Sequence, residues 1–105
     1  MARIRVASLA SLPDGAGVRV DAAGLRLALF RVGAGVFALG DRCSHAEASL
    51  SEGFVSDGIV ECPSHGATFD LYTGKALSLP ATSPVPAYRV EVTDGEVFVE
   101  VEEGP

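Results

Sequence analysis

Residues 43–66 read CSHAEASLSEGFVSDGIVECPSHG, and this stretch contains every cysteine and every histidine of the chain. The four residues form two short clips: a first clip from Cys43 to His45 and a second clip from Cys62 to His65. Sixteen residues separate the clips. Thiolates and imidazoles are the ligands of metal centres with mixed sulfur and nitrogen coordination. The sequence therefore predicts one metal site that two loops assemble.

The length and composition of the chain are those of one globular domain. It has 105 residues, of which 48% are hydrophobic and 21% are charged. Its 14 acidic and 8 basic residues give a formal net charge of −6. This charge disfavours nucleic acid and anionic membranes as partners and favours a basic patch on another protein.

The chain shows neither a membrane span nor a secretory signal. No segment reaches the roughly 18 uncharged apolar residues that a span requires. Residues 1–6 interleave arginines with apolar residues, so a signal peptide is not expected. We therefore expect a cytoplasmic protein with reduced thiols. A disulfide between Cys43 and Cys62 is the plainer alternative, but it leaves the two histidines unexplained.

Alternating apolar residues and glycine-rich turns indicate short strands rather than helices. The second clip directly follows one of these strands, so both clips are expected at the same end of a small sheet. Proline residues exclude a helix from residues 79–86, which we expect to pack as a lid. The fold class is all-β, with small packed sheets or a partial barrel. The expected strands are 3–6, 18–21, 25–30, 36–39, 53–55, 59–61, 67–70, 88–92 and 97–101.

Two cysteines and two histidines fit either a structural zinc ion or a Rieske-type 2Fe-2S cluster. A common zinc finger pairs cysteine with cysteine on a hairpin and histidine with histidine on a helix. Here each clip mixes the two residue types and no helix follows, which favours the cluster. A cysteine–histidine hydrolase is disfavoured because no third residue is in sight to orient the histidine.

The two clips resemble the cluster-binding loops of the Rieske family. The likeness rests on Cys43-x-His45 and Cys62-Pro63-x-His65-Gly66, with support from Phe69-Asp70 and Thr73-Gly74. It implies a Rieske-like fold of small antiparallel sheets in a single domain, 1–105, whose cluster-binding part covers about residues 41–82. It also implies one 2Fe-2S cluster, with Cys43 and Cys62 on the inner iron and His45 and His65 on the outer, solvent-facing iron.

Four departures indicate the branch of the family. Rieske proteins of respiratory chains carry an extra disulfide, whereas the corresponding positions here are Ala48 and Ser64. Their cluster also accepts hydrogen bonds from a serine and a tyrosine, at positions that correspond here to Ala67 and Phe69. Loss of these donors disfavours the more negative reduced cluster. We therefore expect a reduction potential below zero, in the lower part of the roughly −150 to +300 mV Rieske range.

The chain resembles the soluble Rieske ferredoxins of multicomponent oxygenases, including aromatic-ring-hydroxylating dioxygenases. The sequence has no further histidines for the mononuclear iron of a terminal oxygenase, so we do not expect an enzyme. The resemblance implies an electron carrier between a flavin-dependent NAD(P)H reductase and a terminal oxygenase. Two alternatives stay open: the Rieske-like small subunit of an NAD(P)H nitrite reductase, and a zinc-stabilised interaction module.

Residues near the clips could serve docking. Glu47 and Glu52 could steer a basic partner toward the cluster. Ala46, Ala48, Leu79, Pro80 and Ala81 could form an apolar collar for brief contacts, or they could only cover the cluster from water, the role that we favour for Pro80.

Overall fold

The computed structural model describes residues 2–44, 47–64, 66–79, 81 and 83–101. This part of the chain is nearly all-β, as predicted, with two single-turn 3-10 helices. In chain order its elements are β1 (Ala2–Ser8), η1 (Leu9–Ser11), β2 (Gly17–Ala22), β3 (Leu25–Val32), β4 (Gly35–Gly40), η2 (Leu50–Glu52), β5 (Phe54–Ser56), β6 (Ile59–Glu61), β7 (Thr68–Asp70), β8 (Ala87–Tyr88), β9 (Val90–Thr93) and β10 (Glu96–Val101).

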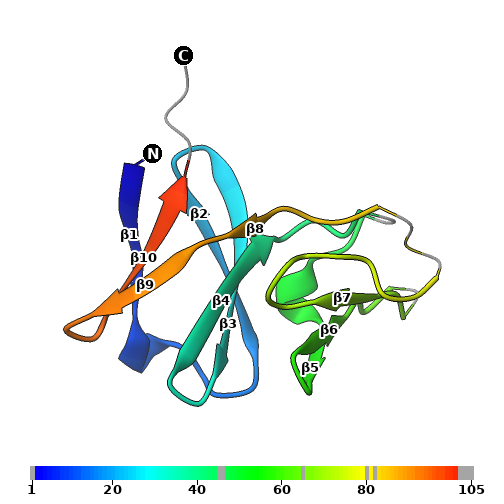
Figure 1. Cartoon of the computed structure of the whole chain (residues 1–105), viewed down its shortest axis with the longest axis horizontal. Helices are drawn as coiled ribbons and strands as arrows, with labels where there is room; N and C mark the ends of the chain where they lie inside the picture. Colours follow the sequence, from blue (N-terminus) through cyan, green and yellow to red (C-terminus); the bar gives the residue numbers. More distant parts are fainter. Residues whose placement is uncertain (1, 45–46, 65, 80, 82, 102–105) are drawn as a thin grey trace.

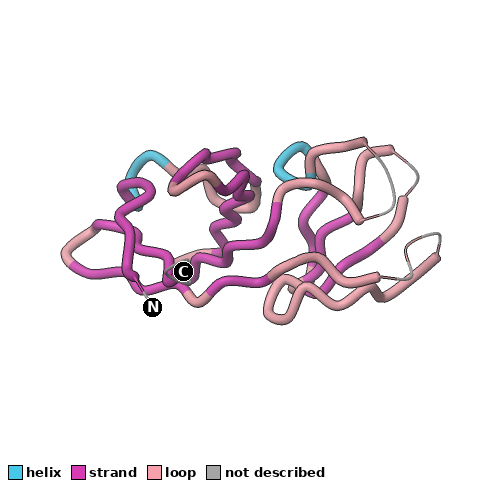
Figure 2. The backbone as a smooth tube through the Cα atoms, turned by 90° about the horizontal axis from the view of Figure 1, so that it is seen from above, coloured by secondary structure: helices cyan, strands magenta, loops and turns pink. Residues whose placement is uncertain are grey.

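The strands form three antiparallel sheets, in the orders β1-β10-β9, β2-β3-β4-β8 and β5-β6-β7. The first two sheets lie together on the left of Figure 1, and β5, β6 and β7 lie on the right. In Figure 2 most loops gather at the end of the molecule that carries this third sheet. The small antiparallel sheets that the sequence predicts are therefore confirmed.

The predicted hairpins follow from turn chemistry. The two central residues of three turns, 23–24, 57–58 and 94–95, all have positive φ. This is the type I′ geometry, whose twist matches that of the flanking strands. Asp-Gly occupies two of these turns, whereas the first has Ala23 before Gly24, so an alanine is held at φ 52°. Asp-Gly favours two of these turns locally, whereas pairing of the flanking Ala22 and Leu25 holds Ala23 in the same geometry.

The expected strand 88–92 is divided in the structure. Tyr88 pairs with Ala38 of β4, whereas Val90 pairs with Val99 of β10. The chain thus changes sheets at Arg89, whose carbonyl oxygen accepts a hydrogen bond from the Glu100 amide at 2.9 Å. The apolar alternation continues through both halves, so periodicity does not reveal a change of partner strand. The prediction of one continuous strand was wrong for this reason.

Strand β3 separates two hydrophobic cores. Leu27 and Leu29 face the first core, which includes Val97 and Val99 of β10. Ala28 and Phe30 face the second core, which contains both cysteines. A strand buried on both faces reads as an almost continuous apolar run, and residues 25–30 show this pattern. The second core positions the clips against the sheet.

Neither of the two short helices in the described chain has the length and apolarity that a membrane crossing needs.

Candidate metal centre

The two clips begin at equivalent positions, which we call corners: each is the last paired residue in one arm of a hairpin. The Cys43 amide donates a hydrogen bond to the Ala48 carbonyl at 2.9 Å, and the Cys62 amide donates one to the Ala67 carbonyl at 2.7 Å. One residue earlier, Arg42 pairs with Ser49, and Glu61 pairs with Thr68. Each cysteine is therefore the last paired residue before a four-residue connection, 44–47 or 63–66. The similar spacing within the clips corresponds to a similar backbone arrangement.

Both cysteines are buried thiols. Cys43 is 2% exposed and Cys62 is 1% exposed, and both belong to the second core. Neither is oxidised to a disulfide, so the structure gives no support to that alternative. The predicted ligands His45 and His65 lie outside the described residues. The described residues therefore contain no group of three metal-binding side chains, and the four-residue ligand set stays a prediction.

The apolar surroundings of the cysteines suit a neutral metal cluster better than two thiolates without a metal. The cysteines share the second core with apolar side chains that include Leu50, Val60 and Phe69. A thiolate buried among such side chains is strongly disfavoured unless a cation neutralises it. Two ferric ions, two sulfides and two thiolates sum to zero charge. A neutral centre of this kind suits an apolar site that offers sulfur ligands from two corners.

The proline-containing segment 79–86 packs beside the first clip. The Ser44 hydroxyl donates a hydrogen bond to the Ser83 carbonyl at 2.6 Å, and Val85 is buried in the second core. The Val85 amide also donates to the Gly74 carbonyl at 2.9 Å. Gly74 has φ +76°, and a Cβ there would lie 2.2 Å from the Val85 oxygen. The segment therefore contacts the first clip at Ser44, but Pro80 and Thr82 lie outside the described residues, and its role as a lid stays a prediction.

The expected docking collar is only partly exposed. Leu79 is 77% exposed, but Ala81 is 5% exposed and belongs to the core, so Ala81 cannot offer a docking surface. Ala48 is half-buried, and Ala46 and Pro80 lie outside the described residues. Glu47 is exposed but paired with Arg42, which offsets its charge, whereas Glu52 is exposed.

The residues at the two expected hydrogen-bond positions have no hydroxyl and are fully buried. Ala67 and Phe69 are both 0% exposed and belong to the core that contains the cysteines. Two nearby hydroxyls have other partners. Ser44 donates to Ser83, and the Thr68 hydroxyl lies 2.7 Å from that of Ser78. These contacts are compatible with the expected low potential, which stays a prediction.

Asp41 is a residue that the sequence analysis did not single out. Its side chain is fully buried and ion-paired to Arg26 of β3 at 2.8 Å. Burial opposes ionisation of this carboxyl, but hydrogen bonds from Ser51, Arg26 and Ser49 outweigh that effect and lower its pKa. The available sequence signal was its place two residues before Cys43, between an apolar strand and the first clip. An acidic residue in a loop is usually solvated, so the sequence did not indicate this role.

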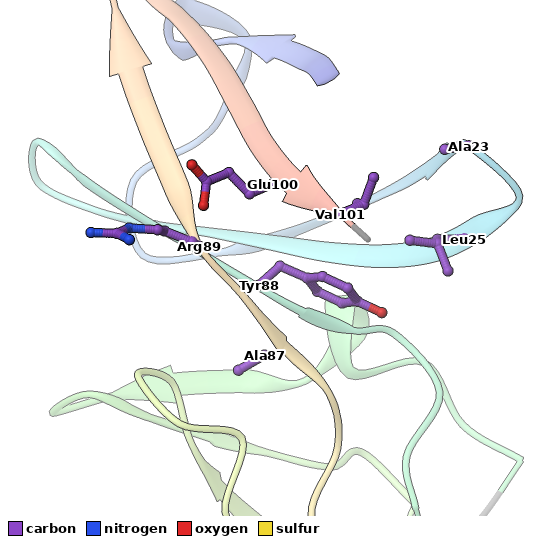
Figure 3. Close-up of a pocket in the computed structure, with 7 residues that line it drawn as sticks. All are labelled: Ala23, Leu25, Ala87, Tyr88, Arg89, Glu100 and Val101. Carbon is purple, nitrogen blue, oxygen red and sulfur yellow. The ribbon is translucent and has the colours of Figure 1, made fainter. Parts of the chain in front are cut away.

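A cavity of about 400 Å³ is lined by residues outside both clips, at positions 23–25, 87–89 and 100–101. Figure 3 shows Tyr88, Arg89 and Glu100 among its lining residues, which come from the region where the chain changes sheets. Neither cysteine lines this cavity. It is therefore not the candidate metal centre.

Comparison with known proteins gives consistent matches over nearly the whole chain. The pattern of the Rieske [2Fe-2S] domain matches residues 2–89. The 3-phenylpropionate/cinnamic acid dioxygenase ferredoxin subunit of Escherichia coli (strain K12) is 47% identical over 104 residues, which cover 98% of this chain and 97% of that protein.

Solved structures show the same fold. The ferredoxin of carbazole 1,9a-dioxygenase from Nocardioides aromaticivorans IC177 superposes with a TM-score of 0.92 at 36% identity, covering 97% of this chain and all of that one. A ferredoxin solved in complex with the oxygenase of carbazole 1,9a-dioxygenase gives 0.87 at 38% identity, with 98% and 96% covered. A Mycobacterium tuberculosis protein assigned as the small subunit of an NADH-dependent nitrite reductase gives 0.86 at 32% identity, with 97% of each chain covered.

Proposed function

Because the chain belongs to the Rieske [2Fe-2S] domain family, we propose that it is the ferredoxin component of a multicomponent oxygenase. In this role it carries electrons and is not itself an enzyme. The main support is its 47% identity to a dioxygenase ferredoxin subunit along almost the full length of both proteins. A carrier of this kind needs one redox centre and a surface for brief docking, and it needs no substrate pocket.

In this proposal Cys43 and Cys62 would hold one iron of the single 2Fe-2S cluster, and His45 and His65 would hold the other. The matched hairpin corners support the two cysteines, because each corner ends in a buried thiol. The histidines are supported by their spacing in the two clips. When bound, a Rieske-type cluster accepts and returns one electron at a time.

The protein residues around this site hold the ligands and limit the access of water. Leu50, Val60 and Phe69 are apolar members of the core that contains both cysteines. Residues 83–85 contact the first clip through the Ser44–Ser83 hydrogen bond, and Val85 is buried in the same core as the cysteines. Excluding water from the cysteine side lowers the dielectric there and protects the sulfur ligands. Ser44, Pro63 and Ser64, which follow the two cysteines, are exposed.

The partners in this proposal are a flavin-dependent NAD(P)H reductase that supplies electrons and a terminal oxygenase that receives them. The solved complex of a similar ferredoxin with its oxygenase supports the second partner. The net charge of −6 and the exposed Glu52 suit a basic docking surface. We place the protein in the cytoplasm, where its reduced thiols are stable.

The observation that carries the proposal is the match to a dioxygenase ferredoxin subunit along almost the whole chain, and the two equivalent corners, each ending in a buried cysteine, support a cluster site. The test is to purify the protein without oxygen and measure iron, acid-labile sulfide and zinc. We expect about two irons and two sulfides per chain and a rhombic electron-resonance signal after reduction. Electron transfer is then assayed with candidate flavin reductases and terminal oxygenases. Zinc without iron or sulfide would identify a structural module instead.

A second candidate is the small subunit of a nitrite reductase, which the similarity to the Mycobacterium tuberculosis protein favours. Its identity of 32% is lower than the 47% to the dioxygenase ferredoxin subunit. Affinity purification from native cells separates the two roles. A permanent subunit would copurify with a large sirohaem protein, whereas a carrier would be recovered alone.

A further inference from the structure

The first clip has less backbone support than the second. Strands β5, β6 and β7 form a three-stranded ladder that leads directly into Cys62. Strand β4 instead ends at Gly40, and the two arms of the first clip are joined by the single isolated bridge between Arg42 and Ser49. Among the described residues, a sheet therefore supports the second clip, whereas side-chain contacts support the first.

Asp41 supplies such contacts at the base of the first clip. One of its carboxylate oxygens accepts the Ser51 amide at 2.8 Å, and the other accepts Nε of Arg26 at 2.8 Å. The same guanidinium donates to the Ser49 hydroxyl at 2.5 Å. The pair thus joins β3 to both arms of the hairpin that carries Cys43.

The backbone of Asp41 reinforces this arrangement. Its amide donates to the Arg26 carbonyl at 3.0 Å, and its carbonyl accepts the Leu50 amide at 2.7 Å. Residue 41 therefore contacts β3 and the returning arm through both its main chain and its side chain.

Because Asp41 is buried, its carboxylate must keep its hydrogen-bond partners. The Asp41 side chain is fully buried, whereas that of Arg26 is 36% exposed. A buried carboxylate is tolerated only when its partners are in place, and removal of one partner leaves an uncompensated charge. The clip cannot move relative to β3 without breaking these contacts, so the pair restricts the position of Cys43.

We infer that Asp41 and Arg26 form a positioning pair that fixes the first clip against β3 and thereby sets the geometry with which Cys43 reaches the cluster. This inference rests on the proposed function, because it takes the cluster to be the occupant of the site. Neither residue is proposed as an iron ligand. They act as outer partners that orient a ligand, a role whose loss commonly weakens metal binding 10–100-fold.

The test compares wild-type holoprotein with Arg26→Lys and Asp41→Asn. Lysine keeps the charge but lacks the planar fork that reaches Asp41 and Ser49 together. Iron release to a chelator should be about tenfold faster in Arg26→Lys and faster still in Asp41→Asn. Hydrogen exchange measured by mass spectrometry should rise in residues 41–52 and stay unchanged in residues 59–70. The electron-resonance g-values of the reduced cluster should also shift, a change that general destabilisation does not produce.

Arg31→Lys is the matched control. Arg31 lies on the same strand, and its guanidinium donates to the carbonyls of Gly33, Leu12 and Leu9 at 2.8, 3.1 and 3.3 Å. The substitution removes a similar set of contacts away from the clips. We expect wild-type iron release and g-values in this variant.

Two results would overturn the inference: equal iron release by Arg26→Lys and Arg31→Lys, or wild-type exchange in residues 41–52 of both test variants. If Asp41→Asn does not fold, Arg26→Lys alone decides. Failure of the proposed function is a different result, because it appears in the wild-type protein as absence of iron and labile sulfide.

Discussion

Gly17 of β2 lies directly against the backbone of Ser51, at the end of the hairpin that carries Cys43. A Cβ built on Gly17 would come within 2.6 Å of the Ser51 carbonyl oxygen and within 2.8 Å of the Phe30 ring. The absence of a side chain at position 17 therefore allows the first clip to pack on the sheet.

Gly17→Ala should displace the segment around Ser51 and loosen the first clip. The alanine methyl group would meet backbone atoms, which cannot rotate away, so we expect a loss of about 1–3 kcal/mol in the free energy of unfolding. Denaturant unfolding of the holoprotein measures this loss. Gly35→Ala is the control, because Gly35 also begins a strand and its added Cβ would approach no atom closer than 3.4 Å. Equal stability of the two variants would contradict the close packing at Gly17.

Ala23→Asn should stabilise the protein. Ala23 is held at φ 52°, in the left-handed region that costs an ordinary L-residue about 1–2 kcal/mol and that asparagine adopts more readily. We expect a gain of up to about 1 kcal/mol, measured by thermal or denaturant unfolding. Ala34→Asn, in a turn residue without positive φ, should bring no such gain. An unchanged or lower stability in Ala23→Asn would show that the turn is not strained.

The pKa of the Glu91 carboxyl should lie below its ordinary value. A hydrogen bond from Arg3 at 2.8 Å, followed by the charge of that guanidinium, lowers the pKa of the Glu91 carboxyl. The stabilisation is therefore present above the ordinary glutamate pKa and disappears as the pH falls through the lowered value. Arg3→Gln should raise the pKa of Glu91 in a carboxyl NMR titration, whereas Arg5→Gln should not, because Arg5 pairs with Glu96. A Glu91 pKa that does not respond to Arg3→Gln would refute the pairing.

Loss of a proposed ligand should abolish the native cluster. Cys43→Ser and His45→Ala each remove one ligand, so we expect loss of the visible absorption and of the rhombic electron-resonance signal after anaerobic purification. Ser44→Ala is the control within the same clip, since it removes only the hydrogen bond to Ser83. A His45→Ala protein with an unchanged Rieske spectrum would exclude His45 from the ligand set.

The reduction potential should lie below zero. Ala67 is buried in the same core as both cysteines and offers no hydroxyl to the site. Ala67→Ser should raise the potential, because a hydrogen bond to the cluster favours the more negative reduced form. Protein-film voltammetry on both proteins measures the difference, with Ser78→Ala as a control for a hydroxyl that already has a partner. A wild-type potential above about +100 mV, within the Rieske range, would show that the inference from residues 67 and 69 was wrong.

The sequence predicted the features that neighbouring residues determine. Apolar alternation located the strands, and glycine-rich turns indicated where they are separated. The clips indicated the family and its cluster, because few sites combine cysteine and histidine at this spacing. The roles of His45 and His65 as ligands stay predictions.

Only the tertiary structure showed which distant segments meet. It pairs β1 with β10, moves the chain from one sheet to another at Arg89, and brings Arg26 to Asp41. Turns and strand alternation depend on a few adjacent residues, so the sequence by itself determined them. Strand partners and buried ion pairs depend on how all surfaces pack together, and no local pattern records that choice.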